Sequence, residues 1–447
     1  MTKQEFRKLA DERILILDGA TGSNLIKRGM PKDACTEAWV SEHAEILQDL
    51  QREYMESGSD IVYAPTFSAN RIKLWEHGLL DRIEELNREL VRISKEAVGE
   101  KVLVAGDVTM TGAQLEPLGD LSFNGLVDIY KEQIAYLADA GVDLLVVETM
   151  LSLQETRAAV LAAHEVCDLP IMATLSFNEQ GRTLYGVAAK SAIVVLQGMG
   201  VDAVGVNCSA GPDKLISVIE EMKKYAAVPI IAKPNAGMPK LMADGNTAYD
   251  MGPEEFAGCM EQILTAGAGI VGGCCGSTPE FIKRTADIVR GKKPQLSDAQ
   301  DVIYLTSDRE VYTFTPGQKL TVGRDIDFTQ NEELVEEYQD EIFETAIELA
   351  EDMEDDVDII AFCTDAEGID AAKAAHEVAE EISRAVNKPL VLVSDSLETI
   401  EYALRHFTGI MALQWSHNLE EWDTKIKDMA KSYHVPIVTI DNEIIYC

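Results

Sequence analysis

Basic residues are scarce in this sequence. Its 447 residues include 39 Lys and Arg against 77 Asp and Glu, which gives a formal net charge of −38. A surface of that sign repels phosphate, so the composition argues against nucleic-acid partners and against anionic membrane surfaces. The negative charge is unevenly distributed along the chain. Residues 301–447 hold 34 acidic and 10 basic residues and carry −24 of the total. We interpret it as a solvated acidic surface.

Long apolar runs are lacking as well. No stretch approaches the ~18 uninterrupted apolar residues of a membrane-spanning helix, and the start, Met1–Glu5, has no apolar signal core. The eight cysteines, without a secretory signal, do not suggest a disulfide framework. Since 46% of the residues are hydrophobic, enough for a sizeable core, the sequence predicts a soluble, cytoplasmic protein with no membrane partner.

What the sequence does contain is a regular alternation of short apolar runs and amphipathic stretches of helical period. Eight apolar runs fall at 14–17, 60–64, 102–105, 143–147, 170–175, 203–206, 229–232 and 270–271. Helix candidates lie between them, such as 44–56, 124–140, 152–166, 213–225 and 254–266. Eight strand–helix units in this length predict an α/β fold, a (β/α)8 TIM barrel, for residues 1–292. An open doubly wound sheet is the alternative, but it rarely needs eight consecutive parallel strands.

Polar or thiol-bearing residues follow every one of these runs. A barrel brings such residues together, because its reactive groups lie at the carboxyl-terminal tips of the strands. The tips are Asp18–Gly19, Thr66, Asp107, Glu148, Ser176, Asn207–Cys208, Asn235 and Cys274–Cys275. The pattern predicts a functional site at this end of the barrel.

Three cysteines are candidate metal ligands. Cys208 would project from the sixth strand, and Cys274 and Cys275 from the eighth, close enough to share one ion. Three thiolates around Zn²⁺ leave one open position and an electron-rich metal, which lowers the pKa of an incoming thiol yet keeps its sulfur nucleophilic. Asn235, on the strand between them, could orient the ligands or occupy the open position without substrate. The alternative is that the adjacent pair is buried as small hydrophobes or forms a strained vicinal disulfide.

Four segments resemble a known family, the homocysteine S-methyltransferases, and most closely the homocysteine module of cobalamin-dependent methionine synthases. The similarity covers about residues 8–292. The segments are Leu17-Asp18-Gly19-Ala20-Thr21-Gly22, Val206-Asn207-Cys208, Pro234-Asn235-Ala236-Gly237 and Ile270-Val271-Gly272-Gly273-Cys274-Cys275-Gly276-Ser277-Thr278-Pro279. The double-cysteine segment is the most specific of them.

The resemblance implies Zn²⁺ on Cys208, Cys274 and Cys275, with the sulfur of homocysteine as fourth ligand. It also implies that Glu148 receives the substrate ammonium while Asp18 and Gly19 help shape the amino-acid pocket. For Asp18, a turn-forming role before glycine is the alternative. We expect no classical general base, because the metal takes the thiol as thiolate and the sulfur then attacks a methyl carbon in line.

The C-terminal part differs in organisation. Residues 293–301 are interpreted as a linker, and the α/β pattern resumes in 302–447, with helices expected at 331–353, 370–386, 397–406 and 418–432. This part resembles the first half of a pterin-binding barrel, but the family's Gly-Glu-Arg is Gly323-Arg324-Asp325 here. About four strand–helix units cannot close a barrel alone. We therefore expect a degenerate, non-catalytic α/β domain that binds no folate and serves in docking or as the contact of a homo-oligomer.

Taken together, the sequence favours transfer of a methyl group from methylcobalamin to homocysteine, giving methionine. None of the seven histidines has an Asp two residues before it, as the cobalamin motif Asp-x-His-x-x-Gly requires, so the donor would be carried by a separate corrinoid protein. A second hypothesis takes the methyl group from a small onium donor, such as S-methylmethionine or a betaine. A third, a non-catalytic zinc-binding scaffold, predicts metal binding without affinity for homocysteine.

Overall fold

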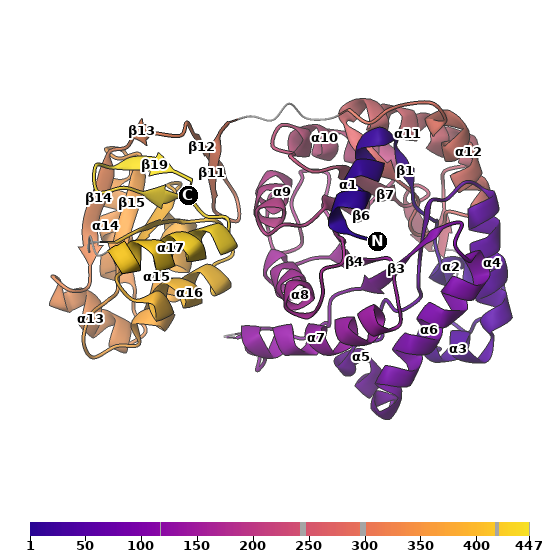
Figure 1. Ribbon diagram of the computed structural model, residues 1–447, viewed down its shortest axis with the longest axis horizontal. Helices are drawn as coiled ribbons and strands as arrows, with labels where there is room; N and C mark the ends of the chain where they lie inside the picture. The colour runs from indigo at the N-terminus through magenta and orange to yellow at the C-terminus, as the bar shows by residue number, and fades with distance from the viewer. Residues whose placement is uncertain (117, 242–246, 296–300, 416–419, 447) are drawn as a thin grey trace. The chain divides into compact units, whose positions relative to one another are not determined.

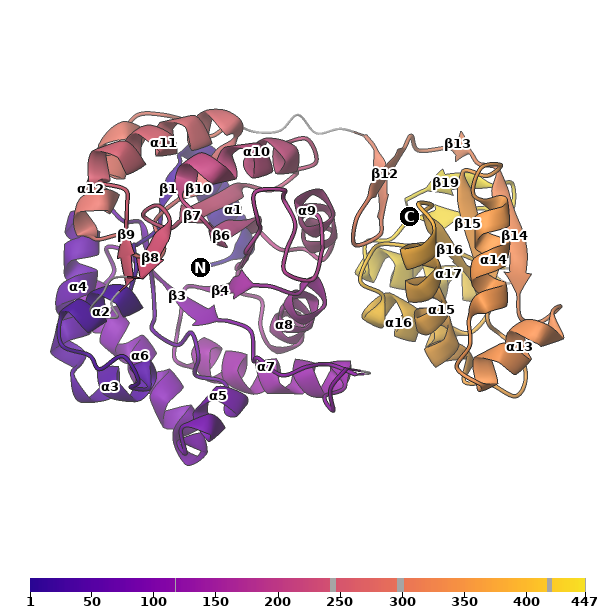
Figure 2. The same cartoon turned by 180° about the vertical axis from the view of Figure 1, so that it is seen from behind.

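The computed structural model describes residues 1–116, 118–241, 247–295, 301–415 and 420–446. The chain forms two compact units, Met1–Ala189 with Gly200–Asp298 and Lys190–Met199 with Ala299–Cys447, and Figures 1 and 2 show their elements from two sides. Most of the expected linker lies outside the described residues, since 296–300 are not among them. Within the described ranges, no helix is long and apolar enough to cross a membrane.

An eight-stranded parallel sheet forms the centre of the first unit. Its strand order is β1-β10-β7-β6-β5-β4-β3-β2. A parallel bridge between Leu17 and Ile61 joins the two outer strands of that order and closes the sheet into a barrel. The predicted TIM barrel is therefore confirmed, and the open-sheet alternative is wrong. The strands are β1 (Leu15–Ile16), β2 (Ile61–Tyr63), β3 (Leu103–Val108), β4 (Leu144–Met150), β5 (Ile171–Leu175), β6 (Ala203–Cys208), β7 (Ile230–Pro234) and β10 (Ala268–Val271).

Helices connect these strands, and several begin where the sequence satisfies free backbone N–H groups. The side chains of Ser122 and Ser152 accept hydrogen bonds at the starts of α7 and α8, and α10, α11 and α12 each begin with proline. The elements are α1 (Lys3–Glu12), α2 (Gly22–Lys27), α3 (Thr36–Glu42), α4 (Ala44–Glu56), α5 (Arg71–Glu76), η1 (Leu80–Arg82), α6 (Ile83–Val98), α7 (Phe123–Asp139), α8 (Leu153–Val166), α9 (Ala189–Gly198), α10 (Pro212–Lys223), α11 (Pro253–Ala266) and α12 (Pro279–Val289).

Helix α1 closes the amino-terminal end of the barrel. A capping box between Thr2 and Glu5 fixes its start. Its buried residues Phe6 and Ala10 belong to one apolar cluster with residues from the first halves of strands, among them Leu144 and Ala203. Because that end is filled with apolar side chains, polar groups inside the barrel are confined to the opposite, carboxyl-terminal end.

A seven-stranded sheet forms the centre of the second unit. Five strands run parallel in chain order, and β19 and β13 complete the sheet in antiparallel fashion beside β18. The strands are β13 (Gln318–Lys319), β14 (Val322–Asp327), β15 (Ile359–Cys363), β16 (Leu390–Val393), β17 (Ala412–Gln414), β18 (Ile437–Val438) and β19 (Glu443–Ile445), with a separate hairpin of β11 (Ile303–Thr306) and β12 (Val311–Phe314). The helices are α13 (Glu332–Gln339), α14 (Glu344–Met353), α15 (Ala371–Ala385), α16 (Leu397–His406) and α17 (Glu420–Ser432).

The two faces of this second sheet are covered differently. On β15, Ile360 and Phe362 pack in a cluster with helix residues, whereas Ile359 and Ala361 pack in another cluster with Ile303 of the hairpin. Successive side chains of a strand point to opposite faces, so the apolar run buries both. The sheet is thus half of a barrel whose inner face is covered by the β11–β12 hairpin.

Two local features of this unit differ from the sequence expectation. The single helix expected at 331–353 is broken into α13 and α14, with Glu341 in a left-handed conformation (φ 59°) between them. Both the backbone N–H and the hydroxyl of Thr345 donate to the carboxylate of Glu337, which stabilises the break. Strand β19 was not expected, because its three residues are too few to give a periodic pattern.

Candidate active site

The three candidate cysteines converge at the carboxyl-terminal end of the barrel. Cys208 is the last residue of β6, and Cys274 and Cys275 lie just after β10, with β7 between the two strands. The Sγ atoms of all three lie within 4.8 Å of one another. A tetrahedral Zn²⁺ with Zn–S bonds of about 2.3 Å separates its sulfur ligands by roughly 3.8 Å. Three sulfurs within this limit can reach that spacing, so the donor set fits a thiophilic metal ion.

Backbone hydrogen bonds hold the double-cysteine segment against its neighbouring strands. The N–H of Cys274 donates to the carbonyl of Pro234 on β7 (2.7 Å), and the N–H of Gly273 donates to that of Asp18 after β1 (3.1 Å). This close approach requires glycine, because a Cβ on Gly272 would lie 2.7 Å from the Cβ of Leu17. On β6, Cys208 itself adopts a left-handed conformation (φ 58°), which turns the end of that strand.

The three thiols share hydrogen bonds, and this changes their acidities. The thiols of Cys208 and Cys274 lower the pKa of Cys275 to about 3, because both hydrogen-bond to its sulfur. Hydrogen bonds with Cys274 and Cys275 raise the pKa of Cys208. The three sulfurs thus already hydrogen-bond to one another, and a cation that replaces the shared protons would find its ligands assembled.

Tyr249 completes the surroundings of the cluster from a hairpin after β7, formed by β8 (Pro239–Leu241) and β9 (Thr247–Tyr249). Its phenol hydrogen-bonds to Cys275, and its ring lies over Gly276, where an added Cβ would come within 2.3 Å of Tyr249 Cδ2. No sequence motif indicates Tyr249, because only the pairing of β8 with β9 brings it back to the thiols.

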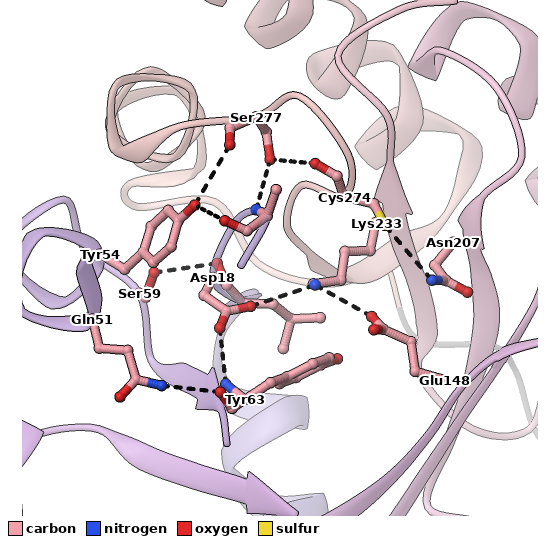
Figure 3. A network of polar contacts seen from close by, with 12 residues as sticks. Asp18, Gln51, Tyr54, Ser59, Tyr63, Glu148, Asn207, Lys233, Cys274 and Ser277 are labelled. Atoms are coloured by element: carbon pink, nitrogen blue, oxygen red, sulfur yellow. Dashed lines mark hydrogen bonds and ion pairs between the residues drawn. The ribbon is translucent and has the colours of Figure 1, made fainter. Parts of the chain in front are cut away.

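A second polar cluster lies deeper in the barrel and is centred on Lys233 of β7. Figure 3 shows its ammonium group between the carboxylates of Asp18 and Glu148. Lys233 Nζ is 3.4 Å from Asp18 Oδ1 and 3.2 Å from Glu148 Oε1, and all three side chains are at most 7% exposed. The same Nζ lies 4.4 Å from the ring centroid of Tyr63.

Burial dominates the electrostatics of this second cluster. It raises the pKa of Asp18 to about 6 and that of Glu148 to about 7, although Lys233 opposes both shifts. Burial would lower the pKa of Lys233, but Glu148 and Asp18 outweigh it and raise that pKa. Asp107 is also buried and has its pKa raised well above the usual value. Perturbed carboxylates at the strand tips of a barrel are typical of a binding or catalytic site.

Asn207 connects the thiol cluster to strand β4. Its side-chain Oδ1 accepts from the N–H of Thr149 (3.1 Å), and its Nδ2 donates to Thr149 Oγ1 (2.6 Å). The same Nδ2 donates to Cys274 Sγ at 3.9 Å, the dashed contact at the right of Figure 3. The polar residue that the sequence placed beside Cys208 therefore orients one of the thiols.

The remaining sequence-predicted residues have distinct surroundings. Asn235 is buried, and its Oδ1 has no hydrogen-bond partner within the described part of the chain. Gly19 packs under Tyr54, since an added Cβ would lie 2.7 Å from the tyrosine hydroxyl. Thr66 hydrogen-bonds to the backbone of Asp107, and Ser176 donates to the carbonyl of Asn207, so both hydroxyls connect neighbouring strand ends.

Lys233 is a second residue of this site that the sequence motifs do not indicate. The apolar run was ended at Ala232, and a lysine after such a run is usually a solvated strand end. In the structure β7 continues through Pro234, so Lys233 lies on the strand and is buried. The available signal was its position between an apolar run and the Pro234–Asn235 segment, at the tip of a barrel strand.

The fold and the two clusters define a class: α/β barrels with a thiol-rich, carboxylate-lined site at the carboxyl ends of the strands. The model of the homocysteine S-methyltransferase family matches residues 15–289, more than half of the chain, and the chain belongs to that family. The expectation from the sequence motifs is thereby confirmed at the level of the family.

Individual relatives agree with this assignment. The chain is 27% identical to methionine synthase of Mycobacterium tuberculosis and 26% identical to that of Mycobacterium leprae, over 94% and 92% of its own length. It spans only 37% and 36% of those proteins. Among solved structures, the oxidized form of the homocysteine methyltransferase MmuM from Escherichia coli superposes with a TM-score of 0.54 at 23% identity, over 63% of this chain and 98% of that one. At this identity the likeness supports the fold alone.

Proposed function

We propose that this protein transfers a methyl group to the thiolate of homocysteine, giving methionine, and that it uses one Zn²⁺ per chain held by Cys208, Cys274 and Cys275. The observation that carries the proposal is the convergence of these three sulfurs within 4.8 Å, at the mouth of a barrel whose family acts on homocysteine. The buried carboxylates of Asp18 and Glu148, which suit a substrate ammonium group, support it.

When bound, Zn²⁺ would act as a Lewis acid that lowers the pKa of the substrate thiol and so supplies a thiolate at neutral pH. The three cysteine thiolates hold the ion, and Asn207 directs an N–H at Cys274. Glu148 and Asp18 receive the substrate ammonium and fix the distance from it to the sulfur. The unpaired Oδ1 of Asn235 is available to a substrate group or to the open metal position.

The chemical step needs little more from the protein than alignment. The thiol proton leaves to solvent, a sulfur–carbon bond forms, and the bond between the methyl carbon and its donor breaks with its electron pair remaining on the donor. Both bonds must lie in line, and a fixed ammonium receptor contributes to that alignment. No described side chain needs to act as a general base.

We further propose that the methyl donor is methylcobalamin carried by a separate corrinoid protein, and that the enzyme is cytoplasmic. The similarity to methionine synthases over both parts of the chain supports a corrinoid donor. A small onium donor, S-methylmethionine or a betaine, is the alternative for the same barrel, and a zinc-binding scaffold without turnover is the alternative of another class. For residues 302–447 we propose a role in docking the donor protein or in forming a homo-oligomer.

Metal analysis combined with a donor screen tests these proposals. The purified chain should contain one zinc, and methionine formation should be measured with a methylated corrinoid protein, free methylcobalamin, S-methylmethionine and betaine. Turnover with S-methylmethionine or betaine, but with neither methylated corrinoid donor, would exclude the proposal of a corrinoid donor. Zinc binding without homocysteine affinity or turnover would favour the scaffold.

Removal of the residues after 298 tests the role proposed for residues 302–447. We expect the shortened protein to keep its zinc but to lose activity with a corrinoid protein more than with free methylcobalamin. Equal activity of the short and full chains with the protein-bound donor would exclude a docking role.

A further inference from the structure

Lys233 has no role in the function proposed above, yet it occupies the centre of the carboxylate cluster. Its backbone belongs to β7, while its two carboxylate partners come from the end of β1 and from β4. In the barrel, β10 lies between β7 and β1, and β6 and β5 lie between β7 and β4. The lysine side chain therefore spans the interior and connects strands that do not touch each other.

The partners of Lys233 are themselves fixed. Oδ2 of Asp18 accepts from the N–H of Tyr63 (2.8 Å), so only its Oδ1 faces the lysine. The ring of Tyr63 lies beside the ammonium group and restricts it further. Figure 3 shows this arrangement, with Glu148 on the far side of the ammonium group from Asp18. An ammonium held in this way determines where both carboxylates lie.

The cluster is not balanced in charge. Three carboxylates, those of Asp18, Asp107 and Glu148, are buried with one lysine. Asp18 Oδ1 and Glu148 Oε1 face the Lys233 ammonium group, whereas Asp107 Oδ1 has no hydrogen-bond partner within the described residues. A buried acceptor without a donor is costly, and an ammonium group brings three N–H donors and a positive charge. The cluster therefore has room, in charge and in hydrogen bonds, for a second ammonium.

A purely structural ion pair is a weaker explanation. Replacing a buried ion pair by apolar side chains is often neutral or stabilising, so stability alone does not explain a lysine at this position. The lysine also lies among the groups that face the substrate site rather than among the apolar residues that α1 covers. The position of Lys233 favours a role in substrate recognition.

We propose that Lys233 is a positioning residue that holds Asp18 and Glu148 together, ionised and correctly spaced, as a receptor for the ammonium group of the substrate. This inference rests on the proposed function and adds the residue that determines selectivity for α-amino thiols. Without Lys233, the two carboxylates would take up protons or separate, and the receptor would lose its charge.

The test compares two thiols that differ only in the amino group, homocysteine and 4-mercaptobutanoate, in the zinc-loaded full-length protein. For Lys233→Met we expect the dissociation constant and KM of homocysteine to rise at least about tenfold, because a buried charge pair is broken, while 4-mercaptobutanoate binding changes less than about twofold. The kcat and the zinc content should change little. Lys95→Met is the matched control, since Lys95 also forms an ion pair, with Asp143 (2.6 Å), but away from the strand tips.

The pH dependence is a second readout that a structural role would not change. The titratable groups that interact with Lys233 are Glu148, Asp18, Asp107, Tyr63, Tyr54 and Cys274. Removal of the lysine raises the pKa of the two carboxylates further, so the loss in homocysteine affinity should be largest near pH 7 and shrink toward pH 9. The control variant should follow the wild-type profile at every pH.

Three outcomes decide the matter. A selective loss for homocysteine supports the inference, whereas equal losses for both thiols, or no loss, overturn it and leave the proposed function intact. A zinc-loaded wild-type protein that binds neither thiol would overturn the proposed function and the inference with it. Should Lys233→Met fail to fold, Lys233→Gln, which keeps hydrogen-bond donors without the charge, is expected to show the same selective loss.

Discussion

The two sheets of this protein treat their strand tips in opposite ways. In the barrel, Asp107 Oδ1 is buried without a hydrogen-bond partner among the described residues, while Asp18 Oδ1 and Glu148 Oε1 share the ammonium group of Lys233. In the second sheet, the carboxylate after β15 is fully used: Asp365 accepts from Ser394 Oγ through both oxygens (2.9 and 2.8 Å) and from the N–H of Asp395 (3.0 Å). Carboxylates follow strands in both units. In the barrel one of their oxygens is left without a hydrogen-bond donor, whereas in the second sheet the carboxylate of Asp365 is hydrogen-bonded within its own loop region.

The closure of the sheets explains part of this difference. Eight strands enclose an interior in which side chains from non-adjacent strands meet, as Lys233 meets Asp18 and Glu148. Five parallel strands enclose nothing, and the hairpin of β11 and β12 fills the inner face with apolar residues. A binding site needs reactive side chains, and it needs them to meet at one place. The barrel brings such side chains together from several strands.

Loss of the thiol cluster should have the largest effect. For Cys208→Ser combined with Cys274→Ser, we expect loss of stoichiometric zinc and a fall of at least about 10³-fold in methionine formation, because structural and catalytic zinc sites need their thiolates. Metal analysis and circular dichroism should show a metal-free but folded barrel. One zinc per chain in the double variant would refute the ligand assignment.

Glu148→Gln should have the next largest effect. The neutral amide keeps the shape but removes the charge that we propose receives the substrate ammonium, so kcat/KM for homocysteine should fall about 10- to 100-fold. Zinc content should remain at one per chain. Wild-type kinetics in this variant would show that the barrel cluster, like that of Asp365, is structural.

The same substitution should stabilise the protein at high pH. Because the folded-state pKa of Glu148 is raised to about 7 from 4.5, its stabilising contribution is complete below about pH 4.5 and is lost as the pH rises through 7. Glu148→Gln should therefore unfold like wild type at pH 5 and be more stable by about 1–3 kcal/mol at pH 8. Urea unfolding of the metal-free proteins at both pH values measures the difference, and a variant that is less stable at pH 8 would contradict it.

Substitution in the second sheet should have the smallest effect on function. Asp365→Ala removes the acceptor of three hydrogen bonds and should lower the stability of its unit by about 1–3 kcal/mol. Homocysteine affinity and zinc content should stay at wild-type values. Thermal unfolding and binding measured side by side test this, and a substantial loss of homocysteine affinity would break the contrast between the two units.

The barrel could be predicted from the sequence because each strand is marked by residues that are adjacent in the chain. Each apolar run is short and each is followed by a polar tip, so eight strands and the thiol-bearing tips could be identified without knowing the register. The positions of the thiols followed from strand order alone, since strands six and eight are separated by one neighbour.

What the sequence could not supply depends on contacts across the interior or between distant loops. The end of β7 was placed too early, so Lys233 was not recognised as a buried residue of the site. Tyr249 reaches Cys275 only because β8 and β9 pair into a hairpin. In the second unit, the break between α13 and α14 depends on the hydrogen bonds of Glu337 with Thr345, which periodicity does not reveal.

Helix α1 has a consequence for the order of events. With Phe6 and Ala10 packed in the apolar cluster at the amino-terminal end, the groups at the strand tips are reached from the carboxyl-terminal end of the barrel. If the protein methylates homocysteine as proposed, substrate and methyl donor share this one entrance. A donor protein that covers the entrance would then have to follow homocysteine in and leave before methionine is released.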